Sequence, residues 1–158
     1  MKKSSTIFLK VVILLIAIGV LTGLIWFPQT EGRAAHLDLI SIYTDPFIVY
    51  IYLASTPFFV GLYYAFKLLN LIDANKAFSQ VAVHTLKNMK FASLSLIVFI
   101  ALAELYIRFF AHGDDPAGPT MLGIIASFAA AVIATAAGIF QRLLQNAVDL
   151  KSENDLTV

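Results

Sequence analysis

The chain has 158 residues and a formal net charge of +1, so its charge gives no indication of nucleic-acid binding. Hydrophobic residues make up 59% and charged residues only 13%. This is about half the charge of a typical soluble domain, which excludes an ordinary soluble protein. The absence of cysteine excludes disulfides, thiolate metal sites and a thiol nucleophile. The composition predicts an all-α integral membrane protein with a single domain.

Four hydrophobic runs are long enough to cross a bilayer. They comprise residues 7–27, 46–69, 91–110 and 121–140. Each has about 20 residues or more, the length that crosses roughly 30 Å of hydrocarbon as a helix. The first run follows two lysines, as a secretory signal would. It is too long for a signal and lacks an A-x-A-like site, so we expect a retained helix. We predict one four-helix transmembrane bundle over residues 1–158, with residues 141–158 as a cytoplasmic helix extension and tail.

Lysine and arginine are distributed unevenly between the ends of these runs. The N-terminal end, the connection between the second and third runs, and the tail contain Lys2, Lys3, Lys10, Lys67, Lys76, Lys87, Lys90, Arg142 and Lys151. In the other two loops the only lysine or arginine is Arg33, and the charged residues are otherwise acidic. Because basic loops remain on the cytoplasmic side, we expect both termini inside and a multi-pass protein of the cell inner (cytoplasmic) membrane.

The second run has clear signals at its start and in its middle. Thr44 or Asp45 can cap a helix whose first position is Pro46. Pro57 lies in mid-span, where it removes a backbone hydrogen bond and predicts a kink.

The connection that follows predicts a turn and then a helix start. Ser79 is a favourable N-cap, and Phe78 with Val83 has the spacing of a hydrophobic staple, so the third helix should begin near Gln80. The fourth helix also continues beyond its apolar run. Together these extensions form a possible cytoplasmic docking surface, although they could equally pack on each other or lie along the headgroups. The candidate docking residues are Asn75, Lys76, Phe78, Ser79 and, in the C-terminal tail, Leu156.

The third run contains two ionisable residues, Glu104 and Arg108. A charge near the bilayer centre costs about 2.5–3.5 kcal/mol on insertion scales, so some compensation is expected. The two residues are four apart and share a helix face, with the glutamate on the favourable N-terminal side. We predict an intramembrane polar pair, or else a protonated Glu104. The pair is either a functional switch or ligand site, or a structural feature that fixes which face of the helix is buried.

Hydroxyl residues in the other three runs lie at a membrane depth similar to that of Glu104. Thr22, Tyr52 and Ser127 lie at about the same distance from the centres of their spans as Glu104. We predict that at least one of these hydroxyl groups points toward Glu104 and forms a polar layer.

Small residues predict where helices approach closely. Ala126, Ala130, Ala134 and Gly138 recur every four residues in the fourth run. The first run contains a GxxxG pair, Gly19 and Gly23. Such patterns favour close packing within the bundle or in a homo-oligomer.

No motif indicates a cofactor, a metal centre or an enzyme active site. His112 lies near Asp114 and Asp115, but an acidic solvated turn is the commoner meaning of this pattern, so we predict no metal site. There is no H-E-x-x-H, G-x-S-x-G or phosphate-binding glycine loop. An enzyme is therefore less expected than a non-enzyme.

Three blocks resemble a known family. Residues 68–92 (LLNLIDANKAFSQVAVHTLKNMKFA), residues 143–158 (LLQNAVDLKSENDLTV) and the turn at residues 113–118 (GDDPAG) are similar to the YoaS-like bacterial membrane proteins, domain-of-unknown-function family twenty-nine seventy-five. The resemblance covers nearly the whole chain. It implies four transmembrane helices, no assigned activity, and a gene often placed beside a small helix-turn-helix regulator of the Cro type.

These observations lead to one main functional hypothesis and two alternatives. The main hypothesis is a membrane regulatory or interaction protein that docks a cytoplasmic partner, such as a helix-turn-helix regulator, and itself contacts only protein and the lipid bilayer. The first alternative is a small transporter or channel subunit that uses Glu104 and Arg108. The second is a membrane enzyme.

Overall fold

The computed structural model describes residues 3–30, 38–110 and 117–155. Within these ranges the chain is all α-helical, as predicted, and contains no strand. The helices are α1 (Lys3–Thr30), α2 (Leu39–Tyr43), α3 (Pro46–Asp73), α4 (Gln80–Phe110) and α5 (Ala117–Asp155).

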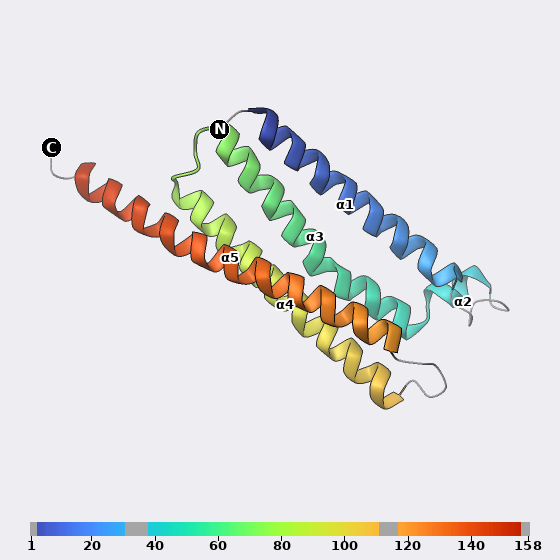
Figure 1. Cartoon of the computed structure of the whole chain (residues 1–158). Coiled ribbons are helices and arrows are strands. Elements are labelled where there is room, and N and C mark those ends of the chain that lie inside the picture. The colour runs from blue at the N-terminus through green and yellow to red at the C-terminus, as the bar shows by residue number, and fades with distance from the viewer. Residues whose placement is uncertain (1–2, 31–37, 111–116, 156–158) are drawn as a thin grey trace.

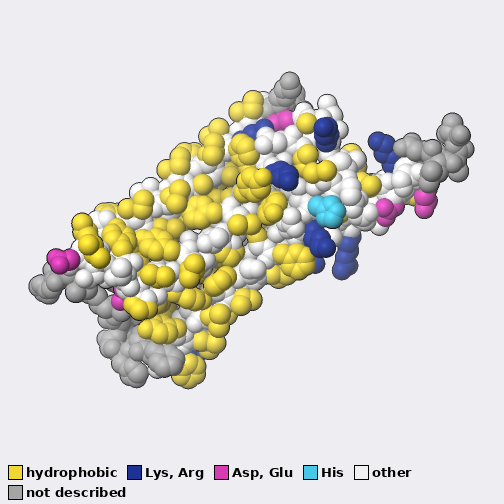
Figure 2. Space-filling view, turned by 180° about the vertical axis from the view of Figure 1, so that it is seen from behind, with side chains coloured by type: hydrophobic (Ala, Val, Ile, Leu, Met, Phe, Trp, Pro, Cys, Tyr) yellow, Lys and Arg dark blue, Asp and Glu magenta, His cyan; other side chains and the backbone are white. Residues whose placement is uncertain are grey.

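Four of these helices are long and apolar enough to cross a membrane, which confirms the four predicted spans. Figure 2 shows a broad hydrophobic surface along the body of the molecule. Helix α5 has 39 residues and is therefore about 58 Å long, well beyond the thickness of the hydrocarbon layer. About 20 residues of a helix are enough to cross that layer.

The four long helices form an open row in chain order (Figure 1). Helix α1 packs on α3, α3 on α4, and α4 on α5. In the described ranges no extended interface joins α1 to α4 or α5. The two edge helices, α1 and α5, are therefore each covered by a neighbouring span along one side only.

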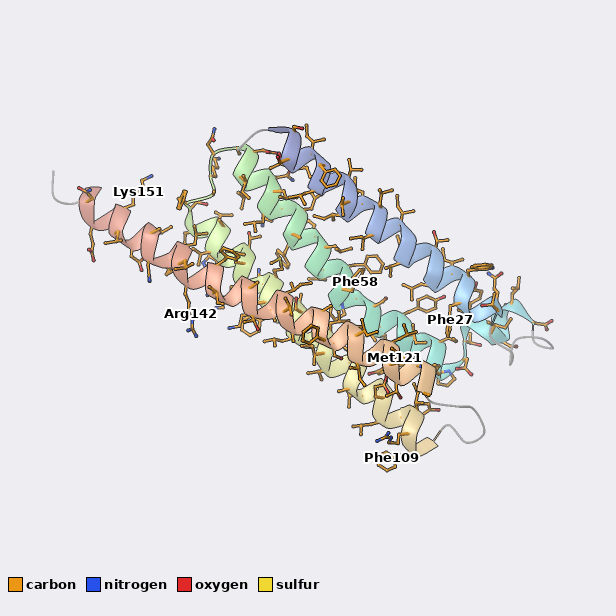
Figure 3. The ribbon with its side chains drawn as sticks, in the orientation of Figure 1. Phe27, Phe58, Phe109, Met121, Arg142 and Lys151 are labelled. Atoms are coloured by element: carbon orange, nitrogen blue, oxygen red, sulfur yellow. The ribbon has the colours of Figure 1, made fainter. Side chains whose placement is uncertain are left out.

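The ends of the row differ in charge. The start of α1, the turn between α3 and α4, and the end of α5 lie at the same end (Figure 1). Lys and Arg side chains gather there (Figure 2), so we name it the basic end. Its described basic residues are Lys10, Lys67, Lys76, Lys87, Lys90, Arg142 and Lys151. Arg142 and Lys151 lie toward this end in Figure 3, whereas Phe27, Phe109 and Met121 lie toward the other.

The interface between α4 and α5 is built from small residues. Ala130, Ala134 and Ala137 are buried on α5, and Ser93 is buried on α4. Small side chains let helix backbones approach closely, which is how helices gain contact energy inside a lipid environment. The predicted four-residue repeat thus forms part of a real interface.

Other members of the small-residue patterns do not pack in this way. Ala126 is exposed. A Cβ atom built on Gly19 or Gly23 meets nothing within 4 Å, so the GxxxG pair of α1 lies on an open surface.

Local sequence signals account for the start of α3. The Asp45 carboxylate accepts hydrogen bonds from the N–H groups of Phe47 (2.8 Å) and Ile48 (3.4 Å), and Pro46 occupies the first turn. The helix continues through Pro57 as a single element.

The α3–α4 turn is a Schellman motif. Asn75 adopts a left-handed conformation (φ 56°). The N–H of Lys76 donates to the Leu71 carbonyl (2.8 Å) and that of Asn75 to the Ile72 carbonyl (3.1 Å). The turn thereby satisfies the last carbonyl groups of α3.

Helix α4 begins at Gln80, immediately after its predicted cap. The Ser79 hydroxyl accepts a hydrogen bond from the Ala82 N–H (3.3 Å). The predicted staple does not bury its aromatic partner, because Phe78 is 68% exposed while Val83 is buried.

A proline near the end of α1 explains the role of Tyr52. Pro28 has no N–H, so the carbonyl of Leu24, four residues earlier, loses its helical donor. The Tyr52 hydroxyl of α3 donates to that carbonyl at 2.9 Å. A tyrosine of one helix thus replaces the hydrogen bond that a proline removes from its neighbour.

We expect Tyr52→Phe to lower the free energy of unfolding by about 1–2 kcal/mol, because it leaves the Leu24 carbonyl without a donor. In a Pro28→Ala background, the loss of unfolding free energy caused by Tyr52→Phe should nearly vanish, since the alanine N–H can donate to the Leu24 carbonyl. Unfolding by sodium dodecyl sulfate in mixed micelles measures both effects. Equal losses in the two backgrounds would contradict this account.

Candidate functional site

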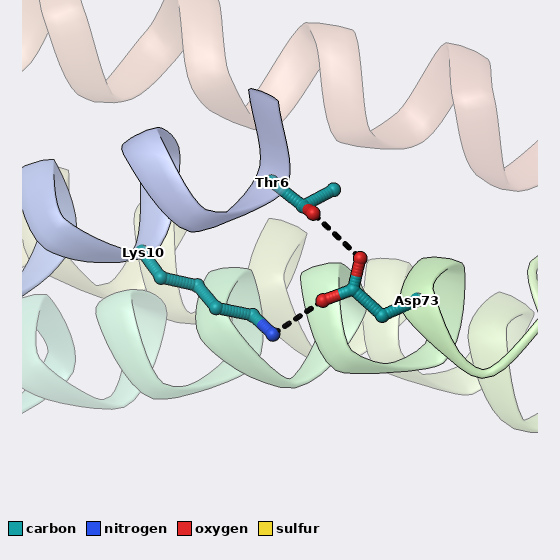
Figure 4. Close-up of polar contacts among 3 residues, drawn as sticks. All are labelled: Thr6, Lys10 and Asp73. Atoms are coloured by element: carbon teal, nitrogen blue, oxygen red, sulfur yellow. Dashed lines mark hydrogen bonds and ion pairs between the residues drawn. The ribbon is translucent and has the colours of Figure 1, made fainter. Parts of the chain in front are cut away.

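A polar cluster joins α1 to α3 at the basic end (Figure 4). The Lys10 ammonium donates to Oδ2 of Asp73 at 2.5 Å, and the Thr6 hydroxyl donates to Oδ1 at 2.6 Å. The Lys10 Nζ also lies 5.7 Å from the centroid of the Phe66 ring. We call Thr6, Lys10 and Asp73 the α1–α3 polar cluster.

Helix electrostatics explain why Asp73 needs this cluster. Asp73 is the last residue of α3, and the negative end of the helix dipole disfavours a carboxylate there. Lys10 supplies the opposite charge, and the side chains of the ion pair are only 20% and 26% exposed. Thr6 is almost completely buried. The cluster therefore attaches the start of α1 to the end of α3.

Sequence reasoning counted Lys10 only among the basic residues that orient the chain and did not single out Asp73, so it missed this cluster. One signal was available. An isolated lysine interrupts the inner end of the first run, and an aspartate follows the inner end of the second. Two opposite charges near the same end of sequential helices indicate a possible pair.

Glu104 lies against α5. A Cβ atom built on Gly123 would approach Cδ of Glu104 to 2.9 Å and Cγ to 3.3 Å. Only a glycine leaves room for this carboxylate between the helices. The side chain is partly buried in the interface and directed toward α5.

The predicted ion pair between Glu104 and Arg108 does not form in the described part of the chain. The ion pair found there joins Lys10 to Asp73, and neither Glu104 nor Arg108 makes a salt bridge. Arg108 is exposed in the last turn of α4. Its long side chain can extend to the lipid headgroups, so the guanidinium needs no partner between the helices.

The predicted polar layer around Glu104 is not assembled in the described residues. The Thr22 hydroxyl donates to the carbonyl of Ile18 in its own helix, on an exposed surface of α1. Tyr52 donates to Leu24, as described above. Ser127 lies one turn beyond Gly123 and is partly buried on the side of α5 that faces α4, but no hydrogen bond joins it to Glu104 there.

The candidate docking residues fall into two groups. Asn75 and Ser79 have local structural roles, in the Schellman motif and the α4 cap. Lys76 and Phe78 are exposed at the basic end. Leu156 lies outside the described residues.

In the ranges that the structure describes, no group of three or more His, Cys, Asp or Glu side chains could hold a metal ion. His112, Asp114 and Asp115 lie outside those ranges.

Four helical spans and a few polar contacts between them define an integral membrane protein. The chain belongs to a family described as "Protein of unknown function (DUF2975)", whose family model matches residues 28–158. It is similar over its full length to the "Uncharacterized membrane protein YoaS" of Bacillus subtilis (strain 168), with 41% identity over 160 residues that cover 100% of both chains. No solved structure matches.

The α1–α3 polar cluster can be tested with a double-mutant cycle. We expect Lys10→Gln and Asp73→Asn each to destabilise the protein, with a coupling energy of about 1 kcal/mol between them. The matched control is Lys67→Gln at the same end, because Lys67 makes no ion pair in the described residues. Additive losses at Lys10 and Asp73 would show that the two residues act independently.

The contact between Glu104 and Gly123 predicts a rescue. Gly123→Ala should cost about 1–3 kcal/mol of stability through overpacking, and much less in a Glu104→Ala background. Gly19→Ala is the matched control, since that position is open and alanine favours the helix. Detergent unfolding measures Gly123→Ala, Glu104→Ala, the double variant and Gly19→Ala. The account fails if Gly123→Ala is equally harmful in both backgrounds.

Proposed function

We propose that this protein is a membrane-anchored docking protein whose basic end faces the cytoplasm. The excess of lysine and arginine at that end supports this orientation under the positive-inside rule. The membrane spans would anchor the protein, and the projecting parts of α4 and α5 would hold a soluble partner.

The observation that carries the proposal is a packed helical stem at the basic end. Ala82 and Leu86 of α4 are buried there. The Gln80 side-chain amide donates to the Gln145 side-chain oxygen of α5 at 3.3 Å. The two helices therefore remain paired over the first turns of α4. A rigid pair of this kind is a suitable platform for another protein.

Exposed apolar side chains on this stem support a protein partner. Phe78 is 68% exposed, and Leu150 is 67% exposed on α5. Leu143 lies seven residues before Leu150 on the same helix face and is also exposed. Beyond the membrane such side chains would face water unless a partner covers them. An apolar stripe on a helix fits a groove between helices of a partner.

The partner class that we propose is a small helix-turn-helix regulator. The support is the family resemblance, since such genes are often placed beside genes of this family. Binding at the membrane would sequester the regulator or change its access to DNA.

A photo-crosslinking amino acid at Phe78 and, separately, at Leu150 tests the proposal in cells. We expect both positions to capture the same small DNA-binding protein, because both side chains project from the stem. Leu53 is the matched control, since it is an exposed apolar residue within the α3 span. Capture of lipid or of the protein's own helices alone from both positions would contradict the proposal.

Binding of the purified partner completes this experiment. The double variant Phe78→Ala, Leu150→Ala should weaken binding at least about tenfold, or about 1.4 kcal/mol. Unfolding of the variant should be nearly unchanged, since both side chains are exposed. Unchanged binding would mean that the stem is not the docking surface.

The second candidate function is a small transporter or channel subunit. Its support is Glu104, a carboxylate within a span that makes no salt bridge in the described residues. A substitution of this residue distinguishes the two candidate functions. Glu104→Gln removes a flux in a transporter, and it leaves partner capture from Phe78 unchanged in a docking protein.

A further inference from the structure

Three cationic side chains meet on one side of the α4–α5 pair. The stem of Lys90 lies across Gly138, with Cδ 3.5 Å from a Cβ built there. Lys87 is one turn before Lys90 on α4, and Arg142 is one turn after Gly138 on α5. Because α4 and α5 are antiparallel, Lys87 lies closer to the basic end than Lys90, and Arg142 lies closer to it than Gly138. Lys87 and Arg142 therefore flank the interface at one level, next to Lys90.

These cations have no carboxylate partner in the described part of the chain. Neither Lys87, Lys90 nor Arg142 makes an ion pair there, and the side chains of Lys87 and Arg142 are exposed. The nearest acidic residue along this side of α5 is Asp149, two turns beyond Arg142. Its carboxylate accepts a hydrogen bond from the Gln145 side-chain amide at 2.7 Å. Three adjacent positive charges remain for an external anion.

The surface next to this group, on its membrane side, is apolar. Leu94 follows Lys90 by one turn and is exposed. The exposed Phe91 ring lies beneath the Lys90 ammonium, with Nζ 6.0 Å from the ring centroid. The exposed Ile139 lies beside Gly138 on α5. The cations thus stand at the boundary between apolar and polar surface, where lipid headgroups lie.

We propose that Lys87, Lys90 and Arg142 bind the headgroup of an anionic phospholipid, whose acyl chains lie on Phe91, Leu94 and Ile139. The phosphodiester accepts hydrogen bonds from two lysines and an arginine, and its negative charge balances theirs. A free phosphate would match the charges, but it would make no use of the adjacent apolar surface. The site lies where α4 and α5 leave their apolar runs, and its three cations differ from the exposed apolar residues Phe78, Leu143 and Leu150 of the proposed docking surface.

Native mass spectrometry of the full-length protein tests this site. The protein is released from vesicles of equal parts phosphatidylglycerol and phosphatidylcholine, and the retained lipids are counted. The test variant is Lys87→Gln, Lys90→Gln, Arg142→Gln. The matched control, Lys67→Gln, Lys76→Gln, Lys151→Gln, removes the same charge from other positions at the basic end.

We expect the wild-type protein to retain phosphatidylglycerol over phosphatidylcholine. The test variant should lose this preference by about tenfold or more, and the control should keep it. Equal loss in both variants would overturn the proposal in favour of a diffuse attraction. Absence of any preference in the wild-type protein would overturn it as well.

Inorganic phosphate separates a lipid site from a phosphate site. Phosphatidylglycerol should raise the melting temperature of the detergent-solubilised protein, and the rise should depend on Lys87, Lys90 and Arg142. An equal rise with inorganic phosphate alone would show that the acyl chains contribute nothing, and would overturn the assignment to a lipid.

Discussion

Hydrocarbon offers no hydrogen-bond partners, and this constraint determines where the polar residues of the protein lie. A carbonyl or hydroxyl group inside a span must find its partner within the protein or lose several kcal/mol. In the described residues, no buried side-chain nitrogen or oxygen lacks a hydrogen-bond partner. Thr22 and Thr135 bond to carbonyl groups of their own helices. The contact between Tyr52 and the Leu24 carbonyl satisfies the same requirement across two helices.

The row of helices is held together in two different ways. The α4–α5 interface depends on close approach along a line of alanines, so its energy is spread over many small contacts. Helix α1 depends on its ends. Its buried residues are Thr6 at one end and Pro28 at the other, and the apolar stretch between them is only half-buried on one side and exposed on the rest. The α1–α3 polar cluster and the Tyr52 hydrogen bond therefore determine how α1 sits on α3.

Sequence reasoning predicted the features that depend on local signals. Run length predicted the spans, Thr44 or Asp45 with Pro46 predicted the start of α3, and Ser79 predicted the start of α4. These predictions were correct because hydropathy and helix capping depend on residues that are neighbours in the sequence.

The contacts between helices were harder to predict. Counting depth placed Tyr52, Thr22 and Glu104 at one level, but depth does not say which helices touch or which way a side chain faces. Helix α1 lies at the edge of the row and never approaches Glu104 closely enough for Thr22 to reach it. The partner of Tyr52 could have been found from Pro28, which frees a carbonyl group four residues earlier. The proximity of Glu104 to Gly123 depends on the helix pairing, which the sequence alone did not provide.

The order of helices in the row has a consequence for biogenesis. Every extended interface between spans joins helices that follow one another in the chain, so contacts are local in sequence. Each span leaving the ribosome can dock at once on the span inserted before it, without waiting for a later helix to close the structure. Assembly can therefore keep pace with synthesis, and the first helices need not remain unpaired in the bilayer until the last residues are made.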